Sequence, residues 1–315
     1  MSYLIRISQP PNRQGLQLGA NRILQASGDT GKGCSTEWAT RWMTRNQSWF
    51  RTIRAKTLAA ERKAVHNIED FDTHFRDFRY AITEFGIVQN DIYNMDETGF
   101  RIRCLGERIV ITHASSRVVY LADPEVRDWV TAIETISASG KTIPAMLILS
   151  GFVMLEKHFD NDLDNNTLFG ITHSGYSNAM IGIEYIKHFD KITAKSTVGK
   201  YRMLIFDGAG SHMSDEFTWY CWQNNIVLFR LLAHTTHLLQ PLNIGIFQPL
   251  KHWHQVSIID SIQYGDLEYS KTEFLHAYQT MRDRTFKKET ILSAWQKTGL
   301  FPYNPSIVLD KMKRF

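Results

Sequence analysis

The chain has 315 residues, of which 43% are hydrophobic and 12% aromatic, so it is long enough to bury a large core. Its formal net charge is only +4, but residues 1–90 hold thirteen Lys and Arg against eight Asp and Glu, which leaves the rest close to neutral. A basic N-terminal region suits a polyanionic partner, although an ordinary solvated helix face would account for the same charges.

Cysteine usage and hydropathy exclude two further classes of protein. Cys34, Cys104 and Cys221 are isolated and odd in number, which favours neither a disulfide framework nor a cysteine-based zinc site and indicates a reducing compartment. The most apolar stretch, residues 142–155, is too short to span a bilayer, and Pro144 interrupts it. No basic region followed by an apolar run opens the chain, so we expect a soluble protein that is not secreted and does not bind membranes.

The first part of the chain predicts small helical elements. Residues 1–33 are expected to be mostly loop, with one short helix over 20–26. Ser35 or Thr36 can cap a second helix, in which tryptophans and arginines fall on different faces. A third amphipathic helix is predicted over 68–85, where phenylalanines recur at steps of three and four residues.

Beyond residue 90, short apolar runs alternate with helical patterns, which is typical of an α/β domain. Strands are predicted over 91–95, 129–137, 143–149, 201–206 and 226–231. Helices are predicted over 214–223, 245–262, 269–284 and 290–297. The turn Ser139-Gly140-Lys141 is expected to join the second and third strands as a hairpin.

Two aspartates stand at the ends of predicted strands. Asp96 lies in the run Asn-Met-Asp-Glu-Thr-Gly-Phe at 94–100, and Asp207 lies in Phe-Asp-Gly at 206–208. Buried like charges repel unless a cation holds them, and oxygen ligands without a neighbouring cysteine select Mg²⁺ or Mn²⁺. Pairs of such ions serve phosphodiester chemistry. The alternative is that each aspartate only caps a turn, because Asp-Gly and Asp-Glu-Thr-Gly are also common turn sequences.

Four motifs follow one another along the chain, at residues 92–100, 206–212, 234–245 and 294–305. Their sequences are Ile-Tyr-Asn-Met-Asp-Glu-Thr-Gly-Phe, Phe-Asp-Gly-Ala-Gly-Ser-His, His-Thr-Thr-His-Leu-Leu-Gln-Pro-Leu-Asn-Ile-Gly and Ala-Trp-Gln-Lys-Thr-Gly-Leu-Phe-Pro-Tyr-Asn-Pro. Together they resemble the catalytic core of pogo-like DDE transposases, a family related to mariner elements. The resemblance covers about residues 85–305. It implies a ribonuclease-H-like α/β fold, with a mixed sheet flanked by helices, and Mg²⁺-dependent cleavage and joining of DNA by three aspartates.

The resemblance assigns a role to three positions. It places Asp96 and Asp207 at the first two catalytic, metal-binding positions and Asn243 at the third, where the family has an aspartate. The amide removes one negative charge and offers no bidentate carboxylate, so a second metal ion should bind poorly. Glu97 is not expected to replace it, because adjacent strand residues point to opposite faces. We therefore expect a weakened or inactive nuclease site.

Basic and polar side chains near these motifs are candidates for contact with DNA. They are Arg41, Arg45, Arg51, Arg54, His212 and Lys251. Residues 20–24 and 38–46, the second of which holds Arg41 and Arg45, resemble the last part of the second helix-turn-helix of these transposases. All four arginines would then mainly contact phosphates, without reading sequence. A turn histidine and a solvated helix face explain His212 and Lys251 equally well.

The sequence therefore predicts a helix-turn-helix remnant over 1–66, a connecting helix over 67–90, a DDE endonuclease domain over 91–305 and a tail over 306–315. The resemblance implies DNA as the partner and a nuclear location, and it leaves open a homodimer that pairs two transposon ends. Two other functions remain open. One is a non-catalytic DNA-binding or scaffold protein derived from a transposase, and the other is a metal-dependent hydrolase on the same fold.

Overall fold

In the computed structural model of the chain, the described residues are 13–28, 31–50, 68–102, 128–208, 214–233, 235–263 and 269–313. The chain divides into two compact units, Met1–Thr73 and His74–Phe315. The division falls inside α4 (Ile68–Phe85), the helix that the sequence predicts over the same residues. The domain boundaries proposed from the sequence remain predictions.

The first unit contains two helices, α2 (Arg13–Ala26) and α3 (Thr36–Arg45). The prediction of a short helix over 20–26 was wrong in length, because the Gln and Arg residues before it are good helix formers. The capping prediction is confirmed, since the Ser35 side chain accepts a hydrogen bond from the Trp38 amide at 3.3 Å. The Trp42 ring stacks on Phe50, with ring centroids 5.4 Å apart, so this tryptophan has a packing role.

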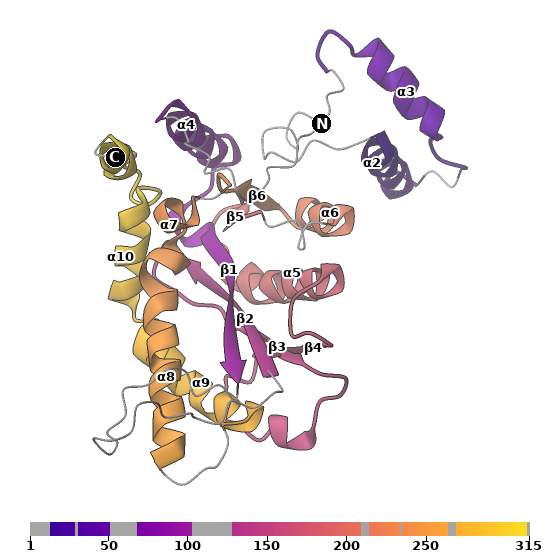
Figure 1. The fold of residues 1–315 in the computed structure, drawn as a ribbon. Coiled ribbons are helices and arrows are strands. Elements are labelled where there is room, and N and C mark those ends of the chain that lie inside the picture. Colours follow the sequence, from indigo (N-terminus) through magenta and orange to yellow (C-terminus); the bar gives the residue numbers. More distant parts are fainter. Residues whose placement is uncertain are drawn as a thin grey trace, which may run out of the picture. The chain divides into compact units, whose positions relative to one another are not determined.

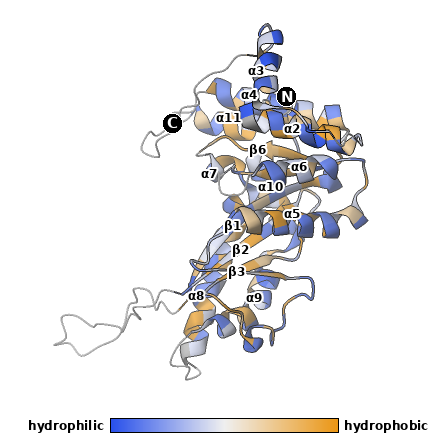
Figure 2. Cartoon of the chain, turned by 90° about the vertical axis from the view of Figure 1, so that its right-hand side faces the viewer, coloured by the Kyte–Doolittle hydropathy of each residue, from blue (hydrophilic) through white to orange (hydrophobic). Residues whose placement is uncertain are grey.

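The second unit is built on a six-stranded mixed sheet with the order β4-β3-β2-β1-β5-β6 (Figure 1). The strands are β1 (Ile92–Ile102), β2 (Asp128–Ser137), β3 (Met146–Ser150), β4 (Leu168–Thr172), β5 (Arg202–Phe206) and β6 (Ile226–Arg230). Strands β1, β2 and β3 are antiparallel neighbours, whereas β4 runs parallel to β3, and β5 runs parallel to both β1 and β6. The strands are largely hydrophobic (Figure 2), as buried strands should be.

Helices cover both faces of this sheet (Figure 1). Besides α4 they are α5 (Ala179–Thr193), α6 (Asp215–Gln223), α7 (Thr236–Leu239), α8 (Phe247–Gln263), α9 (Lys271–Thr285), α10 (Lys288–Thr298) and α11 (Ser306–Met312). Alternating residues of β1 show which helices cover which face. Tyr93 packs against Phe189 of α5, with ring centroids 5.2 Å apart, whereas Phe100 packs against Phe274 of α9 at 5.1 Å. The mixed sheet flanked by helices confirms the predicted fold class.

The described residues of this unit also form short helical turns. The turns η1 (Gln89–Asp91), η2 (Glu156–His158) and η3 (Ala194–Ser196) are 3₁₀, and η5 (Leu242–Ile246) is π-helical. Since η5 leads directly into α8, the third sequence motif forms a helical entry rather than an open loop.

Several elements differ from their predicted bounds. The strand predicted over 91–95 runs from Ile92 to Ile102, because the residues that resemble a turn sequence pair with β2 along their whole length. Strand β4 and helix α5 were not predicted, and α11 forms within the predicted tail. No helix in the described parts of the chain has both the length and the hydropathy needed to cross a bilayer.

Candidate active site

Asp96 and Asp207 stand on or just after neighbouring strands of the sheet. Asp96 is in the middle of β1, not at a strand end as predicted, and Asp207 directly follows β5, which runs parallel to β1. The ladder between β1 and β5 ends at the pair formed by Asn94 and Ile205, two residues before each aspartate. The negative charge of Asp207 acts on the Asp96 carboxyl, so the two carboxylates are within electrostatic range of each other.

Asn243 lies against the first of these aspartates. It belongs to η5, and its Nδ2 donates a hydrogen bond to Oδ2 of Asp96 at 2.8 Å. The structure therefore brings the side chains at all three proposed catalytic positions together, from segments far apart in the sequence. It also shows that the third side chain presents an N–H donor to Asp96, where a carboxylate would present only acceptors.

The pKa of Asp96 is raised by its surroundings. Burial, and after it the negative charge of Asp207, raise the pKa of its carboxyl from the ordinary 3.8 to about 8. The backbone of Glu97 and the side chain of Gln240 donate hydrogen bonds to the carboxylate and oppose the increase in pKa. Without a cation, Asp96 is therefore largely protonated at neutral pH, and a cation bound between the aspartates would restore its charge.

The neighbouring glutamates of the sheet are held by other residues. Glu97 points to the α5 face, where its Oε2 accepts a hydrogen bond from Ser177 Oγ at 2.9 Å, as the alternation along a strand predicts. Glu134 is opposite Asp96 in the β1–β2 register but is fully buried in a salt bridge with Arg282. Its two oxygens accept from Nε and Nη2 of the arginine at 2.8 and 2.9 Å. Neither glutamate replaces the missing third carboxylate.

Asp260, an acidic residue that follows the third motif in the sequence, is too far along α8 to take that role. It lies about 20 Å from the first residue of the helix at the usual rise per residue. Among the described residues, no group of three or more His, Cys, Asp or Glu is placed to hold a metal ion. The donor set at the site is two carboxylates and one amide, which fits a single hard cation better than a pair.

Three further residues shape the site but were not singled out from the sequence. Asn94 and Gln240 are fully buried amides inside the first and third motifs. For Asn94 the available signal was a polar residue within an apolar strand, whereas Gln240 follows α7. Arg230, the last residue of β6, lies against Gly208. Gly208 has a φ of +73°, and a Cβ there would overlap the Arg230 side chain, so the residue after Asp207 must be glycine.

The predicted DNA contacts are only partly described. Arg41 and Arg45 are exposed on α3, and Lys251 is exposed near the start of α8. Arg51, Arg54 and His212 lie outside the described residues. The exposed cations are thus available to solvent, as phosphate contacts would require.

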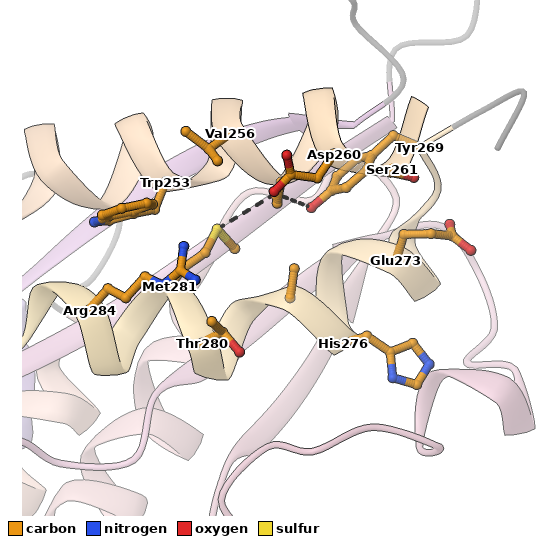
Figure 3. Close-up of a pocket in the computed structure, with 12 residues that line it drawn as sticks. Trp253, Val256, Asp260, Ser261, Tyr269, Glu273, His276, Thr280, Met281 and Arg284 are labelled. Carbon is orange, nitrogen blue, oxygen red and sulfur yellow. Dashed lines mark hydrogen bonds between the residues drawn. The ribbon is translucent and has the colours of Figure 1, made fainter. Parts of the chain in front are cut away.

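A separate pocket lies between α8 and α9 (Figure 3). Trp253 and Arg284 form one side of it, with the guanidinium carbon 4.5 Å from the centre of the aromatic ring. The hydroxyl groups of Ser257 and Tyr269, which also line the pocket, are 2.9 Å apart. None of the three proposed catalytic residues lines this pocket, so we place the candidate chemistry at the sheet and not here.

Comparison with family models matches residues 126–295, just over half of the chain, to the DDE superfamily endonucleases. The matched range includes Asp207 and Asn243 and begins after Asp96. A curated protein of Cochliobolus lunatus, named MFS-type transporter clz9, is 34% identical over 238 residues, which are 75% of this chain and 26% of that protein. The chain thus spans about a quarter of the length of this relative.

Two solved structures of a mariner transposase are also similar. The crystal structure of a pre-cleavage Mos1 transpososome aligns with a TM-score of 0.50 at 11% identity, over 96% of this chain and 79% of that one. The Mos1 mariner paired end complex with Mn gives a TM-score of 0.47 at 13% identity, over 97% and 81% of the two chains. At this identity the first likeness shows a shared fold. By its family match over more than half of its length, together with its mixed sheet, the chain belongs to the DDE superfamily endonucleases.

Proposed function

We propose that this chain is the core of a transposon-derived DNA endonuclease that acts in the nucleus and is weakened at its third catalytic position. The observation that carries the proposal is the hydrogen bond from Asn243 Nδ2 to Asp96 Oδ2. It supports an assembled three-residue site, because residues of the first and third motifs meet there. It also supports the weakening, because the third residue brings a neutral donor where a negatively charged ligand is expected.

Asp96 and Asp207 are the residues that would hold the metal, which we propose to be Mg²⁺ or Mn²⁺. The raised pKa of Asp96 supports this assignment, since two crowded carboxylates gain most from a bound cation. A relative with the same fold, Mos1, was solved with Mn. A metal held there would supply activation of the attacking water and stabilisation of negative charge on the phosphate. Asn243 adds no charge to this site, so it would hold a second ion only weakly.

The remaining parts of the proposal concern DNA. Arg41, Arg45 and Lys251 are exposed cations that would neutralise backbone phosphates, which gives affinity without sequence recognition. Mos1 was solved as a paired end complex, and we propose that this chain likewise acts on DNA ends as a homodimer. Affinity for duplex DNA that falls steeply with salt would separate this function from a hydrolase of small molecules.

A second candidate function is favoured by the same hydrogen bond. Asn243 satisfies Asp96 without any cation, and Asp96 is protonated at neutral pH when no metal is present. A site with satisfied hydrogen bonds suits a protein that has kept the fold and DNA binding but has lost the reaction. We keep this non-catalytic DNA-binding or scaffold function as the alternative.

Plasmid nicking in Mg²⁺ and in Mn²⁺ tests the two functions. The proteins to compare are the natural chain, Asn243→Asp, and Asn243→Asp combined with Asp96→Ala. We expect Asn243→Asp to cut, the natural chain to cut at least tenfold more slowly, and the double variant not to cut. Equal cutting by the natural chain and Asn243→Asp would contradict the weakening, and no cutting by any protein would support the alternative.

A further inference from the structure

Asn94 is a fully buried amide whose two ends bind two different segments of the chain. It lies in β1, two residues before Asp96. Its Nδ2 donates a hydrogen bond to the carbonyl oxygen of Ile205 in β5 at 3.1 Å, and its Oδ1 accepts one from the amide of Leu242 at 3.1 Å. A longer hydrogen bond, of 3.4 Å, reaches the carbonyl of Met95.

The backbone groups that Asn94 contacts stand next to the three proposed catalytic residues. Ile205 is two residues before Asp207, and Leu242 is directly before Asn243. Met95 is directly before Asp96, and its carbonyl also accepts a weak hydrogen bond from Gln240 Nε2 at 3.5 Å. A single side chain therefore connects the backbone of all three motifs.

Backbone pairing between β1 and β5 stops before it reaches the proposed catalytic residues. The ladder between β1 and β5 covers only residues 92–94 of β1 and ends at the pair formed by Asn94 and Ile205. The Asn94 side chain extends the contact just where that ladder ends and Asp207 follows. Leu242 is the first residue of η5, and the first N–H groups of a helix have no partner within the helix. Asn94 supplies that partner.

The amide of Asn94 makes both contacts at once. Its NH₂ group donates to the Ile205 carbonyl and its oxygen accepts from the Leu242 amide, and both of these residues are buried. A carboxylate of the same shape keeps the acceptor and loses the donor, and leucine of similar size loses both.

We propose that Asn94 is a positioning residue, which sets where Asp207 and Asn243 stand relative to Asp96. The proposal rests on the proposed function, because it concerns the geometry of that site. Asn94 does not contact the reacting groups itself. It acts through the backbone on either side, so its loss should move the side chain of Asn243 away from Asp96 while the sheet stays folded.

The side-chain NH₂ group of Asn243 reports this geometry without requiring activity or metal. Its paired ¹⁵N–¹H signals can be assigned as those that disappear in Asn243→Asp. In the natural chain one of the two protons is hydrogen bonded to Asp96. We expect Asn94→Leu to move this signal pair to the position of a free amide and to speed its exchange with water at least tenfold. Asn94→Asp, which keeps the Leu242 contact, should give an intermediate effect.

Asp91→Asn is the matched control. Asp91 is also fully buried, three residues earlier, and it ties the start of β1 to another segment by accepting hydrogen bonds from the Val198 and Gly199 amides at 3.1 and 2.6 Å. We expect the Asn243 signals to be unchanged in Asp91→Asn. If the control moves them as much as Asn94→Leu does, the effect is one of general stability and the proposal is overturned.

Two other outcomes would also overturn it. One is an unchanged Asn243 signal pair in folded Asn94→Leu and Asn94→Asp. The other is loss of the fold in both variants while Asp91→Asn stays folded, which would make Asn94 a folding residue. Failure of the proposed function is seen separately, as absence of nicking by Asn243→Asp. Where Asn243→Asp does cut, adding Asn94→Leu should lower the rate at saturating DNA at least tenfold and leave DNA affinity unchanged.

Discussion

The side-chain amide of Asn243 donates a hydrogen bond to the carboxylate of Asp96, 147 residues earlier in the chain, over 2.8 Å. The pair shows what one substitution does to an otherwise assembled site. An aspartate at position 243 would add a third carboxyl group beside Asp96 and Asp207, and protons or cations would have to offset the repulsion among the three. The asparagine instead donates a hydrogen bond to Asp96, so the Asp96 carboxyl has a partner without a third carboxyl group or a cation.

Asn243→Asp should make stability depend on divalent cations. In a chelator the variant loses the hydrogen bond and gains repulsion at Asp96, and we expect it to be less stable than the natural chain by about 1–3 kcal/mol. Added Mn²⁺ should then stabilise the variant more than the natural chain, because only the folded state holds the carboxylates together. Thermal unfolding with and without Mn²⁺ measures both effects.

The control for this experiment is the combination of Asn243→Asp with Asp96→Ala, which removes a proposed ligand. We expect this protein to show no more stabilisation by Mn²⁺ than the natural chain. An equal Mn²⁺ response of the natural chain and Asn243→Asp would mean that the third position does not bind the ion.

The pKa of Asp96 predicts a pH dependence of stability in metal-free buffer. Its folded-state pKa of about 8 lies above the ordinary value of 3.8. Between these values the folded protein keeps a proton that the unfolded chain has released, so the contribution of Asp96 to the unfolding free energy falls as pH rises from about 4 to about 8. Asp96→Asn removes this dependence. Urea unfolding across that range should therefore show the unfolding free energy of Asp96→Asn rising relative to that of the natural chain as pH increases. A difference between the two proteins that stays constant with pH would contradict the raised pKa of Asp96.

The sequence predicted the elements that local patterns specify. Helix α4 and strand β5 were predicted within one residue, because regular apolar spacing and the Asp207-Gly208 stop mark their limits. Asp96, Asp207 and Asn243 could be named because each lies in a motif that is a continuous run of sequence and resembles the family. Strand β1 was predicted too short, since Asp-Glu-Thr-Gly is a local turn sequence that pairing with β2 overrides.

The contacts that assemble the site could not be predicted in the same way. The roles of Asn94 and Gln240 depend on backbone groups more than a hundred residues away, and no local pattern marks such partners. Strand β4 is short and only half-buried at most of its positions, so its apolar signal is weak. The hydrogen bond between Asn243 and Asp96 likewise depends on the fold, although the residue types were known.

The buried salt bridge between Glu134 and Arg282 should be essential to the sheet. Arg282→Met leaves the fully buried Glu134 without its cation, and we expect a loss of about 3–5 kcal/mol in unfolding free energy. Combining it with Glu134→Gln removes the uncompensated charge and should recover part of the loss. Urea unfolding of the two variants checks this, and equal stability of both would show that the uncompensated charge is not the cause.

Gly99 in the first motif should tolerate no side chain. A Cβ at this position would overlap the Trp129 ring, which packs over β1 from the neighbouring strand. We expect Gly99→Ala to cost about 1–3 kcal/mol through this overpacking. Gly19→Ala is the control, because nothing lies within 4 Å of its Cβ position in α2, and alanine there should add about 0.5–1 kcal/mol to helix stability. Equal effects of the two changes in thermal unfolding would contradict the packing argument.

The arginines of α3 predict a specific salt dependence of DNA binding. Arg41 and Arg45 are exposed, and each is proposed to neutralise one phosphate. The double change Arg41→Ala and Arg45→Ala should then reduce the slope of log affinity against log salt concentration by about 2, equally for unrelated duplexes. Lys187→Ala is the control, because this exposed lysine of α5 is paired with Glu184 at 2.9 Å. A slope that stays unchanged in the double variant would place the phosphate contacts elsewhere, whereas a loss that differs between duplexes would mean that these arginines read sequence.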